Sequence, residues 1–264
     1  MTNSFSVFTK PWRECSVTEL IETVKEMGFD AVEFPLRDGY QVTPAEAEKK
    51  LPLLADRFRA NGVRIDDVAS GTDEHIFAAC AASGIPMIRI MYGYDGKLDA
   101  VEEENKFLRL LEEWSKLCDR YGVKLGLQMH HGFGASTTAG MMRLVGRFDP
   151  KQIGAIWDAA HSGLAGEEPE QAIDICWSHL ALVNFKNARY EMKGRTADGA
   201  AEFDAFFCPG PDGKCSWPRA VAHLKAKGYK GTWCMPAEYT GLTKEQEIEY
   251  TRKDLVWLKS LVEA

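Results

Sequence analysis

The stretch Lys124–His131, KLGLQMHH, decides the fold that this sequence predicts. It follows a long amphipathic helical segment, begins apolar and ends polar, which is typical of a buried strand in a parallel sheet. Side chains alternate between the two faces of a strand, so Gln128 and His130 share one face with Gly126. The polar end of this strand is therefore a candidate part of a functional site.

The same change from apolar to polar occurs in other strand-like runs. In a parallel α/β barrel the C-terminal ends of the strands meet at one rim, where active sites are built. An isolated polar residue at a strand end is commonly a solvated cap, but a set on five strands indicates an enzyme. The polar residues are Glu33 in AVEFP, Gln128 and His130, Asp158 and His161 in IGAIWDAAH, Asn184 and Lys186 in LALVNFKN, and Glu238 in GTWCMPAEY.

Eight strand-like runs, each followed by a helical segment, predict an α/β fold, a single (β/α)8 TIM barrel. An open doubly wound sheet is the alternative, but it usually has a glycine-rich loop after its first strand, and TKPWR at 9–13 has none. One domain is expected over residues 1–264, with a long loop at about 188–216. The expected strands are Phe5–Thr9, Ala31–Pro35, Arg64–Ser70, Met87–Tyr92, Lys124–His131, Ile153–Ala159, Leu180–Lys186 and Thr232–Ala237.

Composition restricts the possible partners. The chain has a net charge of -7 and no basic block, which argues against a nucleic-acid surface. No apolar run approaches the roughly 18 residues of a membrane span, and the first residues do not resemble a signal peptide. The 7 cysteines are scattered, as expected for thiols in a cytoplasmic protein.

The motifs VEFP, LGLQMHHG, WDAAH, NFKN and AEY, in this order, resemble the sugar phosphate isomerase/epimerase family of xylose isomerase-like TIM barrels. That group includes ketose 3-epimerases, inosose dehydratases and hydroxypyruvate isomerases. The resemblance covers nearly the whole chain. It implies an isomerase, epimerase or dehydratase/lyase of carbohydrate metabolism that acts on a sugar, inositol or related polyol by removing a proton next to a carbonyl.

The resemblance also implies one divalent cation, Mn²⁺, Mg²⁺ or similar. Its ligands would fall on Gln128, Asp158, Asn184 and Glu238, where the family usually has Glu, Asp, His and Glu. Amide oxygens can bind a hard cation, but Gln128 and Asn184 supply no charge, so weaker binding is expected. His130 could provide a ligand instead.

By the same resemblance, Glu238 is the expected base, and Lys186 would donate a proton or neutralise an oxyanion. Gln128 cannot act as the second base of an epimerase, although His130 could. Expected substrate contacts are Glu33 and His161 from the resemblance, together with Trp12 near the rim and Arg189 in the long loop, where Lys193 and Arg195 are further candidates for binding a phosphate or carboxylate. Other rim aromatic residues are Tyr92, Tyr94 and Phe133.

Two other functions remain open. The two ligand departures also fit a metal-free pseudoenzyme or a carbohydrate-binding barrel with a degenerate metal site. The DNA-repair nuclease branch of the superfamily needs more histidine and acidic ligands and a basic groove, and 6 His with a net charge of -7 do not suit it. The sequence leaves a homo-oligomer possible.

Overall fold

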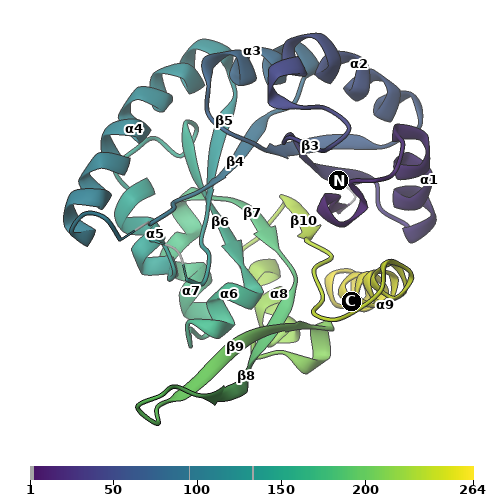
Figure 1. Ribbon diagram of the computed structural model, residues 1–264. Coiled ribbons are helices and arrows are strands. Elements are labelled where there is room, and N and C mark those ends of the chain that lie inside the picture. Colours follow the sequence, from purple (N-terminus) through teal and green to yellow (C-terminus); the bar gives the residue numbers. More distant parts are fainter. Residues whose placement is uncertain (1–2, 95, 133) are drawn as a thin grey trace.

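The computed structural model describes residues 3–94, 96–132 and 134–264. Its parallel strands close into one barrel in the order β1-β10-β7-β6-β5-β4-β3-β2, with helices on the outside (Figure 1). The predicted (β/α)8 TIM barrel is confirmed. The barrel strands are β1 (Ser4–Phe8), β2 (Ala31–Pro35), β3 (Arg64–Ala69), β4 (Met87–Met91), β5 (Lys124–Gln128), β6 (Ile153–Asp158), β7 (Leu180–Asn184) and β10 (Thr232–Met235).

Local sequence sets where the helices begin and end. The first one starts with a capping box, in which Ser16 and Glu19 satisfy each other's backbone N–H groups, and it stops at Gly28, whose φ of 95° is left-handed. The helices are α1 (Val17–Met27), α2 (Ala47–Ala60), α3 (Glu74–Ser83), α4 (Ala100–Tyr121), α5 (Thr138–Val145), α6 (Ala159–Leu164), α7 (Pro169–Cys176), α8 (Trp217–Ala226) and α9 (Lys244–Glu263), and the 3-10 turns are η1 (Lys10–Trp12), η2 (Pro44–Glu46), η3 (Trp177–His179) and η4 (Gly210–Asp212). In the part of the chain that the structure describes, no helix is both long and apolar enough to cross a bilayer.

The inside of the barrel has two layers of side chains. The lower layer, toward the N-terminal ends of the strands, is apolar, and the upper layer, toward their C-terminal ends, is polar. Met87, Ile156, Leu182 and Cys234 pack together in the lower layer. Gly126 leaves room for this cluster, because a Cβ atom there would lie 2.6 Å from the Cδ1 atom of Ile156. In barrels of this kind active sites are built at the C-terminal ends of the strands, which here carry the polar layer.

The predicted long loop after β7 is an antiparallel hairpin, made of β8 (Asn187–Arg195) and β9 (Ala201–Cys208), that projects from the barrel (Figure 1). Its strands meet at an Asp198-Gly199 turn, with Gly199 at a φ of 87°. An Asp-Gly turn between two strands with alternating side chains is typical of a hairpin. The sequence therefore contained a signal that predicts this hairpin. The base of the hairpin brings Phe207 to the barrel rim, where its ring lies 4.8 Å from the Lys186 Nζ atom.

Candidate functional site

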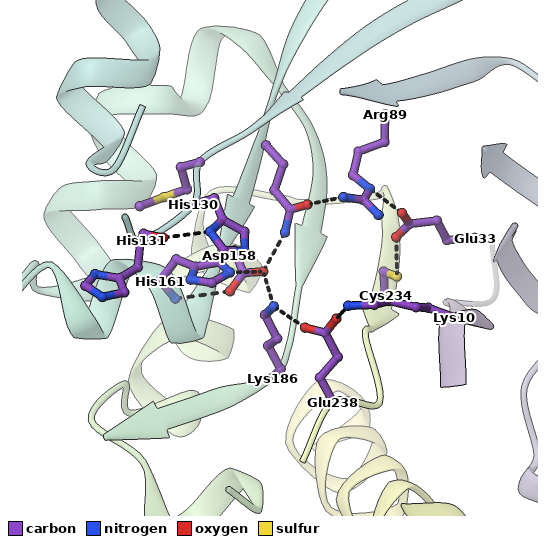
Figure 2. A network of polar contacts seen from close by, with 12 residues as sticks. Lys10, Glu33, Arg89, His130, His131, Asp158, His161, Lys186, Cys234 and Glu238 are labelled. Atoms are coloured by element: carbon purple, nitrogen blue, oxygen red, sulfur yellow. Dashed lines mark hydrogen bonds and ion pairs between the residues drawn. The ribbon is translucent and has the colours of Figure 1, made fainter. Parts of the chain in front are cut away.

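A polar network lies above the apolar layer, at the C-terminal ends of the barrel strands (Figure 2). It surrounds an inner cavity of about 60 Å³, enough for roughly two water molecules. A wider cavity of about 600 Å³ lies beside it and shares Lys10, His130 and Glu238 with it. A ligand could therefore occupy the wider cavity and present one end to the network.

Lys186 is the centre of one half of the network. Its Nζ atom donates a hydrogen bond to Glu238 Oε2 at 2.7 Å and lies 3.7 Å from Asp158 Oδ2. Lys10, from the turn after β1, donates to the other oxygen of Glu238, also at 2.7 Å. Burial would lower the pKa of Lys186, but the Asp158 and Glu238 carboxylates outweigh it and raise that pKa. Lys186 therefore carries a positive charge on the cavity floor.

The same charges act on the two carboxyl groups. Burial would raise the pKa of Glu238, but the ammonium groups of Lys186 and Lys10 outweigh burial and hold it well below its usual range. For Asp158 burial is the stronger effect and raises the pKa, although Lys186 opposes it. Asp158 also caps α6, because its Oδ1 atom accepts the backbone N–H of His161 at 3.1 Å.

Arg89, which the sequence analysis missed, is the centre of the other half. Its guanidinium forms a buried ion pair with Glu33, and its Nη1 atom donates to Gln128 Oε1 at 2.7 Å. The sequence feature that could have indicated its role is the single charged residue inside the apolar run MIRIM of β4, because a buried charge requires a partner. Glu33 is 1% exposed and belongs to this pair. It therefore lies in the network as predicted, but its visible role is to hold Arg89.

Asp67 adds an unusual buried acid to this half of the network. It is opposite Glu33 in the β2–β3 register, and neither of its carboxyl oxygens has a hydrogen-bond partner among the described residues. Burial, and then the neighbouring negative charge of Glu33, raises the pKa of Asp67 well above its usual value. Burial and Glu33 therefore both favour the neutral form of Asp67 over its carboxylate.

The four expected metal ligands come together at the rim, but their donor atoms do not fit a divalent cation as they stand. A guanidinium can only donate hydrogen bonds, so Arg89 fixes Oε1 of Gln128 toward itself and turns the amide NH₂ toward Asp158 Oδ2, at 2.8 Å. Lys186 and Lys10 already neutralise Glu238. Of these four residues, Asn184 alone has a buried oxygen, Oδ1, without a hydrogen-bond partner among the described residues. Within residues 3–94, 96–132 and 134–264, no group of three or more His, Cys, Asp or Glu side chains is arranged for a metal ion.

His130 lines both cavities. Its Nδ1 atom lies 2.8 Å from the carbonyl oxygen of His131, which can only accept, so Nδ1 carries the proton and Nε2 the lone pair. Burial, helped by the positive charge of Lys186, lowers the pKa of His130 to about 4. His130 is thus a neutral imidazole at pH 7 that can accept a proton.

His161 lies behind His130 and is fully buried, with the two ring centroids 3.8 Å apart. Burial and then Lys186 hold its pKa well below the usual range. Its ring lines neither of the two rim cavities. His161 thus lies behind His130 in this structure, and its contact with a substrate stays a prediction.

Two other expected substrate contacts lie away from the rim cavities. Trp12 is 1% exposed and packs in the core between barrel and helices, because η1 turns it under the chain. Arg189 points along the hairpin, where it pairs with Glu191 and covers the ring of Phe206. A substrate contact is not supported for either residue.

The remaining candidates of the rim and the loop also have other partners. Lys193 pairs with Asp204, and Arg195 donates to the carbonyl of Gly199, both within the hairpin. Tyr92 is buried and stacked on Phe107, whereas Tyr94 is exposed. Phe133 lies outside the described residues.

Ala237 positions Glu238 through an uncommon backbone conformation. Its φ is 52°, in the left-handed region that residues other than glycine rarely adopt. This conformation occurs two residues after the end of β10, at the point where the chain leaves the barrel. Such conformations are concentrated at functional sites, where the surrounding structure maintains them.

Comparisons with known proteins agree with this architecture. Residues 21–261 match the family model described as xylose isomerase-like TIM barrel. An inosose dehydratase of Bacillus cereus (strain AH820) is 27% identical over 163 residues, covering 56% of this chain and 54% of that protein, and one of Geobacillus thermodenitrificans is 26% identical over 143 residues, covering 48% of each. The chain thus aligns with about half the length of these relatives.

Solved structures resemble the whole chain in fold. The 3-keto-D-glucoside 4-epimerase of E. coli superimposes with a TM-score of 0.75 at 16% identity, covering 98% of this chain and 100% of that one. A D-psicose 3-epimerase of Clostridium cellulolyticum H10 gives 0.76 at 15% identity, covering 99% and 100%. At these identities the likeness concerns the fold alone. From the family match over residues 21–261, this chain belongs to the xylose isomerase-like TIM barrel family.

Proposed function

We propose that this protein is an enzyme that moves a proton at a carbon next to a carbonyl of a sugar or polyol, as an isomerase, epimerase or dehydratase. One observation carries the proposal: the Lys186 ammonium, 2.7 Å from Glu238 and 3.7 Å from Asp158, lies on the floor of the rim cavity. The inosose dehydratase relatives and the epimerase folds support the substrate class.

The side chains suit this chemistry. Removing a proton next to a carbonyl produces a negatively charged enediolate oxygen, which a preorganised cation stabilises. Lys186 would supply that charge. Glu238 and His130 both line the cavity and can accept a proton, so one could remove a proton and the other return one. A carboxylate held by two ammonium groups is a weak base until a substrate displaces one of them, whereas His130 is already neutral at pH 7.

The predicted divalent cation has no role in these steps. The donor atoms of Gln128 and Glu238 are already committed to protein cations, so the chain's own Lys186 and Arg89 place positive charge at the rim. A cytoplasmic location and assembly into a homo-oligomer stay predictions.

A test is exchange of substrate C–H protons with solvent in D₂O, followed by NMR, on a panel of ketoses and inososes in the presence of EDTA. We expect exchange by the wild-type protein and a loss of about 100-fold or more in Lys186→Met and Glu238→Gln, the usual size of general acid–base effects. Undiminished exchange in both variants would refute the assigned roles.

A sugar-binding barrel without catalysis is the second candidate function. It is favoured by the neutralised carboxylates and by the small inner cavity of about 60 Å³. Binding of a sugar with no exchange of any of its C–H protons would support this function over the enzyme.

A further inference from the structure

The inner cavity is lined by more positive than negative side chains. Four cations, Lys10, Arg37, Arg89 and Lys186, face two carboxylates, Glu33 and Glu238, so the charged lining residues sum to +2. The net charge of these residues stays positive when Asp158, beneath Lys186, is included. This local excess contrasts with the net charge of -7 of the whole chain, so the general composition of the protein does not explain it.

Three of these four cations have a carboxylate partner. Lys10 and Lys186 share Glu238, and Arg89 holds Glu33. These pairs explain why the three side chains can be kept near each other. They also leave Arg37 as the cation whose charge requires another explanation.

Arg37 follows β2 at the rim and is only partly exposed. In the portion of the chain described by the structure, its guanidinium has no hydrogen bond and no ion pair, and its visible contact is the ring of Phe8, 5.8 Å away. Arg89 lies over the same ring at 4.7 Å. Burial and then the charge of Arg89 lower the pKa of Arg37, and Tyr40, Glu33 and Glu238 offset this only in part. A desolvated guanidinium beside a like charge is unfavourable unless an anion joins it.

We propose that the substrate carries a carboxylate or phosphate group and that Arg37 binds this group. The planar guanidinium offers a fork of N–H donors that matches both anions. The proposal rests on the proposed function for the position of the reacting end, which would lie toward Lys186, Glu238 and His130. It adds the class of substrate: an acidic sugar or a sugar phosphate in place of a neutral polyol.

Calorimetric titration with D-glucose, D-glucuronate and D-glucose 6-phosphate tests the proposal without requiring turnover. We expect at least one charged sugar to bind at least tenfold more tightly than glucose, and Arg37→Gln to reduce its affinity to that of glucose. The preferred sugar shows whether the anion is a carboxylate or a phosphate. Arg252→Gln is the matched control, because Arg252 is exposed on α9, lines neither rim cavity and loses the same charge on substitution.

Equal affinities for the charged and neutral sugars, no binding of either charged sugar, or the same affinities in Arg37→Gln and Arg252→Gln would overturn the proposal. Binding that depends on Arg37 without any C–H exchange would leave the anion site intact and reject the enzymatic function. Circular dichroism of both variants shows whether a lost affinity comes from unfolding.

Discussion

Replacing Lys186 by methionine should destabilise the protein far more than replacing Lys10, although both ammonium groups lie 2.7 Å from Glu238. The two lysines differ in burial: the Lys186 side chain is 5% exposed, and that of Lys10 is 46% exposed. Lys186 also lies 3.7 Å from Asp158, which is fully buried. Removing one partner of a buried pair leaves an unpaired buried charge and costs about 3–5 kcal/mol. An exposed pair contributes only about 0.2–1 kcal/mol.

The assay is urea unfolding at pH 7 of the wild type, Lys186→Met, Lys10→Met and the double variant Lys186→Met/Asp158→Asn. The double variant should recover most of the lost free energy of unfolding, because it no longer buries an unpaired carboxylate. Comparable m-values would show that the unfolding transition itself is unchanged. Equal losses in Lys186→Met and Lys10→Met, or no recovery in the double variant, would refute the reasoning.

Three further predictions concern other parts of the network. Gln128→Glu with Asn184→His should tighten Mn²⁺ binding at least tenfold, about 1.4 kcal/mol, because it adds a carboxylate and an imidazole; equal affinities in calorimetry would contradict this. The raised pKa of Asp67 means that the folded state keeps a proton that the unfolded state releases above about pH 4, so stability should fall as the pH rises through the folded-state pKa. Asp67→Asn should flatten that decline in urea unfolding measured over a series of pH values, and parallel profiles for the two proteins would argue against a raised pKa of Asp67. Ala237→Gly should stabilise the fold by up to about 1 kcal/mol, because glycine adopts a φ of 52° without the steric cost of a side chain; a shift of the urea midpoint to lower concentration would count against stored strain.

Much of the barrel could be predicted because strand position and face depend on local patterns. The alternation of side chains correctly placed Asp158, Lys186 and Glu238 together at the rim. The partners of these residues were harder to predict, because an ion pair such as Lys10–Glu238 joins residues 228 positions apart. Short motifs do not show which cation a carboxylate will meet.

The burial of individual side chains was the other property that the sequence did not predict. Trp12 follows a strand at the rim, where the sequence favours an exposed aromatic residue, but one 3-10 turn is enough to direct it into the core. The orientation of Gln128 could not be predicted either, because it depends on Arg89 from the neighbouring strand.

The pairing of β1 with β10 has a consequence for the order of events during synthesis. Ser4 pairs with Thr232 in the closed barrel, so one edge of β1 stays without its partner until most of the chain has left the ribosome. Non-local pairing of this kind is slow to form and leaves a strand edge open meanwhile. The Lys10–Glu238 contact spans this same junction. A nascent chain would therefore complete the polar network only at the final step of closure, and an unfinished barrel would have no assembled site.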